Sequence, residues 1–205
     1  MMNRFEKGVR DCMVPTAELL ARTTEPLHRA ILLNWWRHVH LEGSGQFDKI
    51  VAPDMMVDEP VYRVTWGANP TVIKGKEGVL GFYNSVSEAV LWHSDDRIAV
   101  ADWGVVDELT FHQIARGEDL RALGYDVPEA DRLYHASSRQ VFLWPYDERA
   151  RLAGEHLYED PTSLQVEEVD PSEAITPEQV RRIHLEGLRA LEAERGDRYW
   201  VYDGA

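Results

Sequence analysis

Four β-type segments in the second half of the chain most restrict how it can fold. They are rich in valine, isoleucine, threonine and aromatic side chains, show partial period-two alternation, and lie at residues 89–93, 97–114, 134–144 and 151–159. The turn sequence PYDERAR joins the last two segments as a hairpin. Predicted helices mostly precede these strands rather than alternating with them. This order favours an α+β domain in which a curved antiparallel sheet packs on helices.

The first long helix is predicted from Thr24 to about Glu42, with Pro26 in its first turn and an apolar stripe along one face. The later elements before the sheet are expected, in order, as a short helix, a strand, a loop and a helix at residues 46–51, 57–64, 65–74 and 75–90.

Two segments lie outside this pattern. Residues 115–133 form an acidic insertion between strands that is too long for a hairpin turn. A helix is predicted over residues 177–195, where Thr176 and Gln179 form a capping-box pair. We expect this helix, the aromatic tail that follows it and the insertion to lie near the entrance of any pocket. The expected division is an N-terminal segment, an α+β domain and a C-terminal extension at residues 1–25, 26–160 and 161–205.

Composition restricts the partners. The formal net charge is −14, whereas nucleic acids and anionic membranes are bound by basic surfaces, so neither is an expected partner. No stretch approaches the ~20 apolar residues of a membrane span, and charges interrupt the N-terminal segment where a secretory signal would be apolar. Cys12 is the single cysteine, so no intrachain disulfide is expected. These features favour a cytoplasmic protein that binds a small neutral or apolar molecule.

Motifs for phosphate, dinucleotide or metal binding are not found. The sequence has no Gly-rich phosphate loop, no dinucleotide fingerprint and no nucleophile elbow. His38 and His40 are two positions apart on a helix and therefore point about 200° apart. No metal site is expected.

Three strings stand in an informative order: FDKIVAPDMMVDEP, GKEGVLGFY and the hairpin VFLWPYDERARLAGEHLYED. Together they resemble the nuclear-transport-factor-2-like superfamily, in particular its SnoaL-like enzymes, over roughly residues 26–160. The resemblance implies a cone-shaped barrel of curved sheet, closed by the N-terminal helices around an apolar pocket, with the C-terminal helix added. It also implies no cofactor and a homodimer or higher homo-oligomer. Similar enzymes include ketosteroid isomerase, polyketide cyclases, scytalone dehydratase, limonene epoxide hydrolase and diarylpropane lyases, and other members only bind ligands or proteins.

The acid–acid–proline string at Asp58, Glu59 and Pro60 is similar to the isomerase motif, and the resemblance places the base on Glu59. Independently, Glu59 shares a strand face with Val57 and Val61, where desolvation would raise the pKa of a carboxylate. Asp58 is the candidate if the register differs by one residue, and a solvated strand end is the alternative reading.

The other isomerase residues are missing, because its tyrosine falls on Trp36 and its protonated aspartate near Phe142. Steroid isomerisation is therefore not expected. Further catalytic candidates are Asp102, on the face of Ile98 and Val100, together with His156 and His38. For each of these three a purely structural role is the alternative. His93, beside an expected turn, is predicted to be exposed.

Aromatic side chains are abundant, and ring walls suit a flat apolar ligand. The expected substrate-binding residues are Trp36, Tyr62, Phe82, Trp103, Arg139, Phe142, Trp144 and Tyr158. The resulting hypothesis is a cofactor-independent acid–base enzyme of lyase type that acts by dehydration or C–C cleavage, such as deformylation, on a small aromatic, lignin-derived substrate. The alternatives are a polyketide cyclase, an epoxide hydrolase or a non-catalytic ligand-binding domain.

Overall fold

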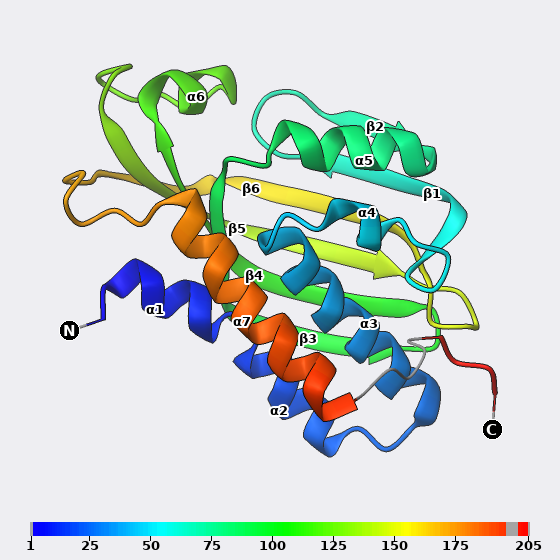
Figure 1. Cartoon of the computed structure of the whole chain (residues 1–205). Coiled ribbons are helices and arrows are strands. Elements are labelled where there is room, and N and C mark those ends of the chain that lie inside the picture. The colour runs from blue at the N-terminus through cyan, green and yellow to red at the C-terminus, as the bar shows by residue number, and fades with distance from the viewer. Residues whose placement is uncertain (1, 196–200, 205) are drawn as a thin grey trace.

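The computed structural model describes residues 2–195 and 201–204. It shows an α+β fold in which one six-stranded sheet curves over a layer of helices (Figure 1). The strands are β1 (Met56–Thr65), β2 (Thr71–Lys74), β3 (Val90–Ala101), β4 (Gly104–Arg116), β5 (Leu133–Pro145) and β6 (Leu152–Glu168). The helices are α1 (Arg4–Asp11), α2 (Val14–Arg22), α3 (Pro26–Gly43), α4 (Phe47–Ile50), α5 (Gly75–Ser85), α6 (Gly117–Ala122) and α7 (Pro177–Arg195).

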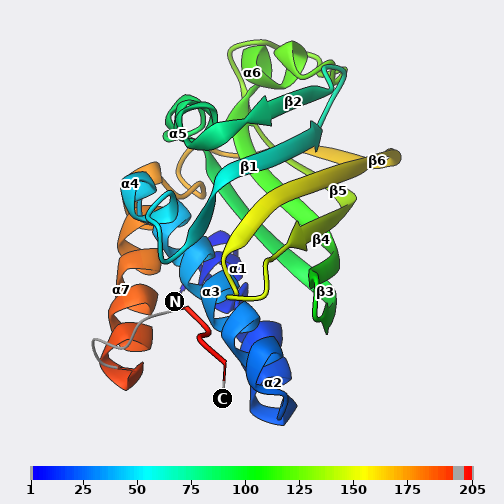
Figure 2. The ribbon, with the colours of Figure 1, turned by 90° about the vertical axis from the view of Figure 1, so that its right-hand side faces the viewer.

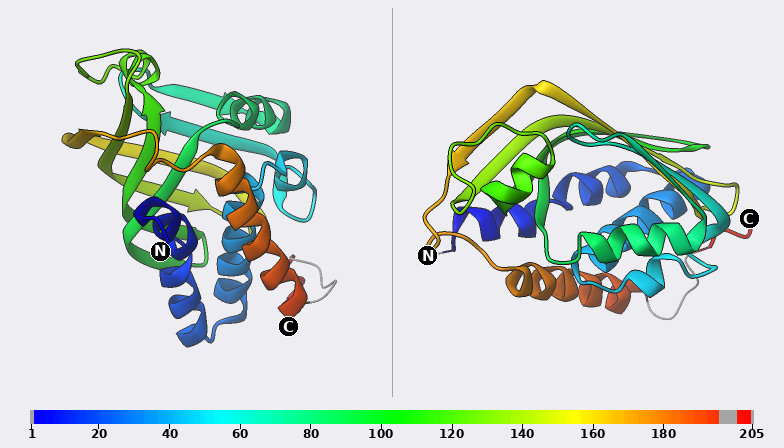
Figure 3. Two further views of the ribbon diagram at one scale, coloured as in Figure 1. Left: turned by 60° about the vertical axis from the view of Figure 1, so that its left-hand side comes forward. Right: turned by 90° about the horizontal axis from the view of Figure 1, so that it is seen from above.

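The sheet has the order β2-β1-β6-β5-β4-β3 and arches over α3, α5 and α7 when seen from above (Figure 3). Strands β3 to β6 pair antiparallel, as do β1 and β2, but β1 runs parallel to β6. The expected α+β fold with a curved sheet is confirmed, but the sheet is open and mixed rather than wholly antiparallel (Figure 2). The parallel pair is possible because the whole chain between the two strands serves as its crossover.

The β3–β4 hairpin divides a segment that the sequence pattern presented as one strand. Asp102 and Trp103 form its two-residue turn, because Ala101 pairs with Gly104. Gly104 has a φ of +146°, and a Cβ there would lie 2.0 Å from the Trp144 carbonyl oxygen. Only glycine fits this close approach of the two backbones. The hairpin turn therefore sits where uninterrupted alternation was expected.

Helix α7 begins with the expected capping box, since the Thr176 N–H donates to Gln179 Oε1 at 2.7 Å and the Gln179 N–H donates to Thr176 Oγ1 at 3.3 Å. It packs against α3, with Leu188 and Leu191 in the main core. Tyr202, in the tail, donates its N–H to the Arg149 carbonyl at 2.9 Å. The other two tail aromatics, at positions 199 and 200, lie outside the described residues.

The insertion at 115–133 folds around α6 and packs on β4. Its apolar cluster contains Leu120, Tyr125 and Val127. No residue of the insertion lines the cavity described below, but Trp66, which packs against this cluster, does. The expectation that the insertion lies near the pocket entrance stays a prediction. No helix in the described ranges is long and apolar enough to span a membrane.

Candidate active site

A cavity lies between the concave face of the sheet and helices α3, α5 and α7. It encloses about 1110 Å³, including the space open to solvent at its mouth. Its walls are mainly apolar and include eight aromatic side chains: Trp35, Phe47, Trp66, Phe82, Trp92, Phe111, Phe142 and Trp144. Helix α7 adds Pro177, Val180, Arg181 and His184, as expected for a C-terminal helix near the pocket. An apolar hollow with few polar groups is typical of a small-molecule site.

Glu155 on β6 and Glu42 on α3 both line this cavity. Glu155 is 5% exposed, and its neighbour Leu157 also faces the cavity. Burial raises the pKa of Glu155 well above its usual range, and the nearby Glu42 carboxylate raises it further, while the Tyr83 hydroxyl partly opposes the shift. The protein therefore favours the protonated form of Glu155.

A chain of hydrogen bonds runs behind this acidic wall. The Tyr62 and Tyr83 hydroxyls are 2.9 Å apart, and the Tyr83 hydroxyl is 2.9 Å from His38 Nε2. The same His38 nitrogen lies 3.5 Å from Glu42 Oε2. Burial raises the pKa of both tyrosines, which keeps them neutral. The chain connects the core to the cavity through groups that both donate and accept protons.

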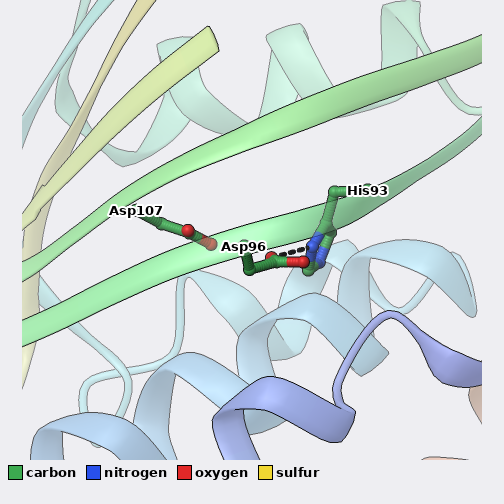
Figure 4. A group of neighbouring side chains, drawn as sticks. All are labelled: His93, Asp96 and Asp107. Carbon is green, nitrogen blue, oxygen red and sulfur yellow. Dashed lines mark hydrogen bonds and ion pairs between the residues drawn. The ribbon is translucent and has the colours of Figure 1, made fainter. Parts of the chain in front are cut away.

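A second polar group lies at the opposite wall, on β3 and β4. His93 lines the cavity, and its Nδ1 is 2.5 Å from Asp96 Oδ1. Burial, the largest single influence, opposes protonation of His93, but the hydrogen bonds and charges of Asp96 and Cys12 together outweigh it and raise the pKa of the imidazole. Burial, followed by the charge of Asp96, raises the pKa of Asp107 to about 8. Figure 4 shows Asp107 on the neighbouring strand, pointing toward Asp96.

This second group corrects the expectation for His93. His93 is 9% exposed rather than solvated, because β3 continues through it to Ala101. Among the described residues, His93, Asp96 and Asp107 are the one group that could hold a metal ion, because one ligand atom from each lies within 4.8 Å of the other two. A search for short histidine or cysteine motifs misses it, because its members come from two strands.

The predicted acids of β1 lie outside the cavity. Asp58 and Glu59 are both exposed, and Asp58 pairs with Lys76 Nζ at 3.1 Å. The pairing of β1 with β6 shifts register between Met56 and Val61, so the simple alternation is lost across the acids. The expectation that Glu59 lies on an apolar face is therefore wrong.

The expectation that Asp102 lies on the face of Ile98 and Val100 is also wrong, because Asp102 lies in the β3–β4 turn. Its side chain is 87% exposed, and it contacts His28 Nε2 at 2.8 Å. His156 lies on the face of β6 opposite Glu155, where burial and the charge of Arg63 lower its pKa. The alternation expected in GEHLYED is correct, but the cavity face is the other one. His38 is fully buried in the hydrogen-bond chain.

Three of the expected substrate-binding residues line the cavity: Phe82, Phe142 and Trp144. Tyr62 is buried behind the wall, and Trp36 donates to His40 Nε2 instead, so its helix neighbour Trp35 takes the wall position. The remaining three do not face the cavity. Trp103 and Tyr158 are exposed, and Arg139 pairs with Glu108 at 3.0 Å on the outer face of the sheet.

Comparison with known proteins shows which solved structures share the fold. No protein-family model matches the chain, and no curated protein matches it. Among solved structures, a protein from Jannaschia sp. CCS1 assigned as a SnoaL-like polyketide cyclase superposes with a TM-score of 0.50, at 15% identity over 68% of this chain and 91% of that one. The chain has a SnoaL-like fold. The resemblance noted in the sequence is confirmed at the level of the fold.

Two further solved structures match the chain with lower scores. Ketosteroid isomerase from Mycobacterium sp. has a TM-score of 0.47 and 16% identity, covering 69% of this chain and 98% of that one. RV0760c from Mycobacterium tuberculosis has a TM-score of 0.49 and 16% identity, covering 71% and 100%. The whole of each smaller structure thus corresponds to about two thirds of this chain.

Proposed function

We propose that the chain is an enzyme that performs acid–base catalysis on a small apolar molecule bound in this cavity. The observation that carries the proposal is Glu155, a buried acid with a raised pKa that faces an aromatic cavity beside a second carboxylate, Glu42. Two carboxyl groups in unequal surroundings can divide the work, because one holds a proton to donate while the other is free to accept.

The surroundings of the two acids suggest their roles. Glu155 is the more buried and would act as the general acid. The Glu42 side chain is 32% exposed and lies 3.5 Å from His38, so it would act as the base, with His38 and Tyr83 returning the proton. The carboxylates of β1 have no part in this proposal.

The reaction that fits is a lyase type, either dehydration or C–C cleavage such as loss of formaldehyde. An elimination needs a base to remove one proton and an acid to protonate the leaving group, and the Glu42–Glu155 wall supplies both. Phe142 and Trp144 stack with ring centroids 5.7 Å apart and an angle of 10°, which provides a flat wall for an aromatic substrate. A lignin-derived aromatic compound has the required shape and polarity.

The main alternative is a ligand-binding domain without chemistry, in which the acids would be sealed by arginines. The pKa of Glu155 is raised, whereas an arginine cap would lower it. Arg181, which lines the cavity, pairs with Glu88 and Glu178 instead. A cyclase or epoxide hydrolase would use the same acid pair and differ in substrate. The homo-oligomeric state stays a prediction.

The test is a panel of aromatic alcohols and diarylpropanes, with binding read by native mass spectrometry and products by loss of water or formaldehyde. With a substrate found, Glu155→Gln should lower kcat about 10²- to 10⁴-fold while binding is retained, because the amide cannot donate an acidic proton. Glu59→Gln is the matched control and should leave kcat unchanged. Equal activity of Glu155→Gln and wild type would contradict the proposal.

A further inference from the structure

The group formed by His93, Asp96 and Asp107 has no part in the acid–base proposal (Figure 4). It is nevertheless more deeply buried than the Glu42–Glu155 pair. Asp107 is 0% exposed, and the Asp96 side chain is 1% exposed. Two carboxylates held this close in an apolar setting repel each other and lose hydration. Protons or a bound cation must therefore balance their charge.

The hydrogen bonds of the group leave three oxygen atoms unused. Asp96 Oδ1 is engaged with His93 Nδ1 at 2.5 Å, but Asp96 Oδ2 has no hydrogen-bond partner. Asp107 lies near the Arg97 backbone N–H and the Asp96 carboxyl, but neither of its oxygens makes a hydrogen bond of normal geometry. A buried carboxylate without partners is strongly unfavourable, and native proteins rarely retain one without a ligand or proton. These oxygens belong to the group of His93, Asp96 and Asp107, in which one ligand atom from each residue lies within 4.8 Å of the other two.

The backbone is bent to bring these side chains together. The pairing of β3 with β4 shifts register between Ser94 and Arg97, which marks a bulge. Within it Asp95 has a φ of +56°, an uncommon conformation for a residue other than glycine. A bulge redirects the side chains on either side of it, and here His93 and Asp96 come to face one another. Asp107 completes the set from the adjacent strand.

We propose that His93, Asp96 and Asp107 bind a divalent first-row transition-metal ion. One imidazole and two carboxylates form a mixed nitrogen and oxygen ligand set of the kind that suits Zn²⁺, Mn²⁺ or Fe²⁺. A dication also balances the charge of the two carboxylates. Three protein ligands leave at least one coordination position for water or a ligand atom, and His93 lines the cavity. The site would therefore act as a Lewis acid at the wall opposite Glu155.

The test uses full-length protein stripped with a chelator and desalted, then titrated separately with Zn²⁺, Mn²⁺ and Co²⁺. We expect binding of one equivalent by calorimetry and elemental analysis, a visible spectrum from bound Co²⁺, and a higher Tm with metal. Asp107→Asn, which preserves shape, should weaken the affinity at least ~100-fold, as expected for loss of a charged ligand. Asp102→Asn, an exposed acid on the same hairpin, is the matched control and should bind as wild type does.

The proposal fails if wild-type protein binds no stoichiometric ion, or if Asp107→Asn binds as tightly as wild type. The first outcome would mean that Asp96 and Asp107 share a proton instead. The wild-type titration decides the question even if a variant does not fold. Glu155→Gln should retain the metal, so failure of this site and failure of the acid–base proposal are distinguished.

Discussion

Two pairs of acids lie in different surroundings: Glu42 and Glu155 line the cavity, whereas Asp96 and Asp107 lie behind His93 in the β3–β4 wall. On the α3–β6 wall, Glu155 lies near the Tyr83 hydroxyl, and Glu42 keeps contact with both solvent and His38. On the β3–β4 wall, Asp107 is fully buried beside Asp96, and neither of its oxygens makes a hydrogen bond of normal geometry. The first wall can exchange protons with its neighbours, whereas the second carries negative charge that only a bound cation or proton can balance. The surroundings therefore decide what a pair of acids can do.

The largest effect that separates the walls is expected in the pH dependence of stability. Because the pKa of Glu155 is raised in the folded protein, the native state keeps a proton that the unfolded chain releases above pH 4.5. The free energy of unfolding therefore falls as pH rises from 4.5 toward the folded pKa, by about 1.4 kcal/mol for each pH unit of that interval. Glu155→Gln removes this loss, so the variant should be more stable than wild type at pH 8.

Urea denaturation of both proteins at several pH values, with chelator present, measures this difference. Glu59→Gln is the control and should follow wild type throughout. If the Glu155→Gln and wild-type curves run parallel, the acid of the α3–β6 wall is not buried in solution as described.

A second prediction concerns helix α7, which packs against α3. A Cβ on Gly43 would lie 2.2 Å from the ring of His184 on α7, and His184 is itself buried. Gly43→Ala should therefore displace α7 and cost about 1–3 kcal/mol, the usual range for overpacking. Gly81→Ala on α5 is the matched control, since nothing lies within 4 Å of its Cβ, and it should stabilise the helix by up to about 1 kcal/mol. Thermal melts decide between these outcomes, and equal Tm shifts would show that α7 is loosely held.

A third prediction tests whether the α3–β6 wall depends on its hydrogen-bond chain. Tyr83→Phe removes the hydroxyl that joins Tyr62 to His38, leaving two buried polar groups without that partner. We expect a loss of about 1–3 kcal/mol in unfolding free energy, with metal affinity at the β3–β4 wall unchanged. A change in metal affinity would show that the two walls are coupled.

The smallest effect is expected outside the cavity. Asp58→Asn removes an exposed ion pair with Lys76, and such pairs contribute little in water. The unfolding free energy should change by less than about 0.5 kcal/mol. A larger loss, measured by urea denaturation, would mean that the β1 acids have a role that their exposure does not indicate.

The order of elements was predictable because it depends on local patterns. The helix expected from Thr24 to Glu42 is α3 (Pro26–Gly43), and the capped C-terminal helix is α7. Period-two alternation also grouped Glu155 correctly against His156. Local patterns do not state which face of a strand is covered by the rest of the chain. The choice of His156 over Glu155 failed for that reason.

The β3–β4 wall was unpredictable for a different reason. It depends on the bulge at Asp95 and on the turn at Asp102 and Trp103, and each changes the register of all residues beyond it. Uninterrupted alternation placed Asp102 on an inner face, and an expected turn placed His93 in solvent, and the structure reverses both.

The parallel pairing of β1 with β6 has a consequence for how the chain is made. Tyr62 on β1 pairs with Glu155 on β6. Strand β1 is the first to be synthesised and β6 the last, so this pairing forms only after β6 has been made. Contacts of such long sequence separation form slowly, because the intervening chain must first be ordered. During synthesis, one edge of β1 stays open to wrong partners until β6 emerges. The α3–β6 wall is therefore completed late in the synthesis and folding of the protein.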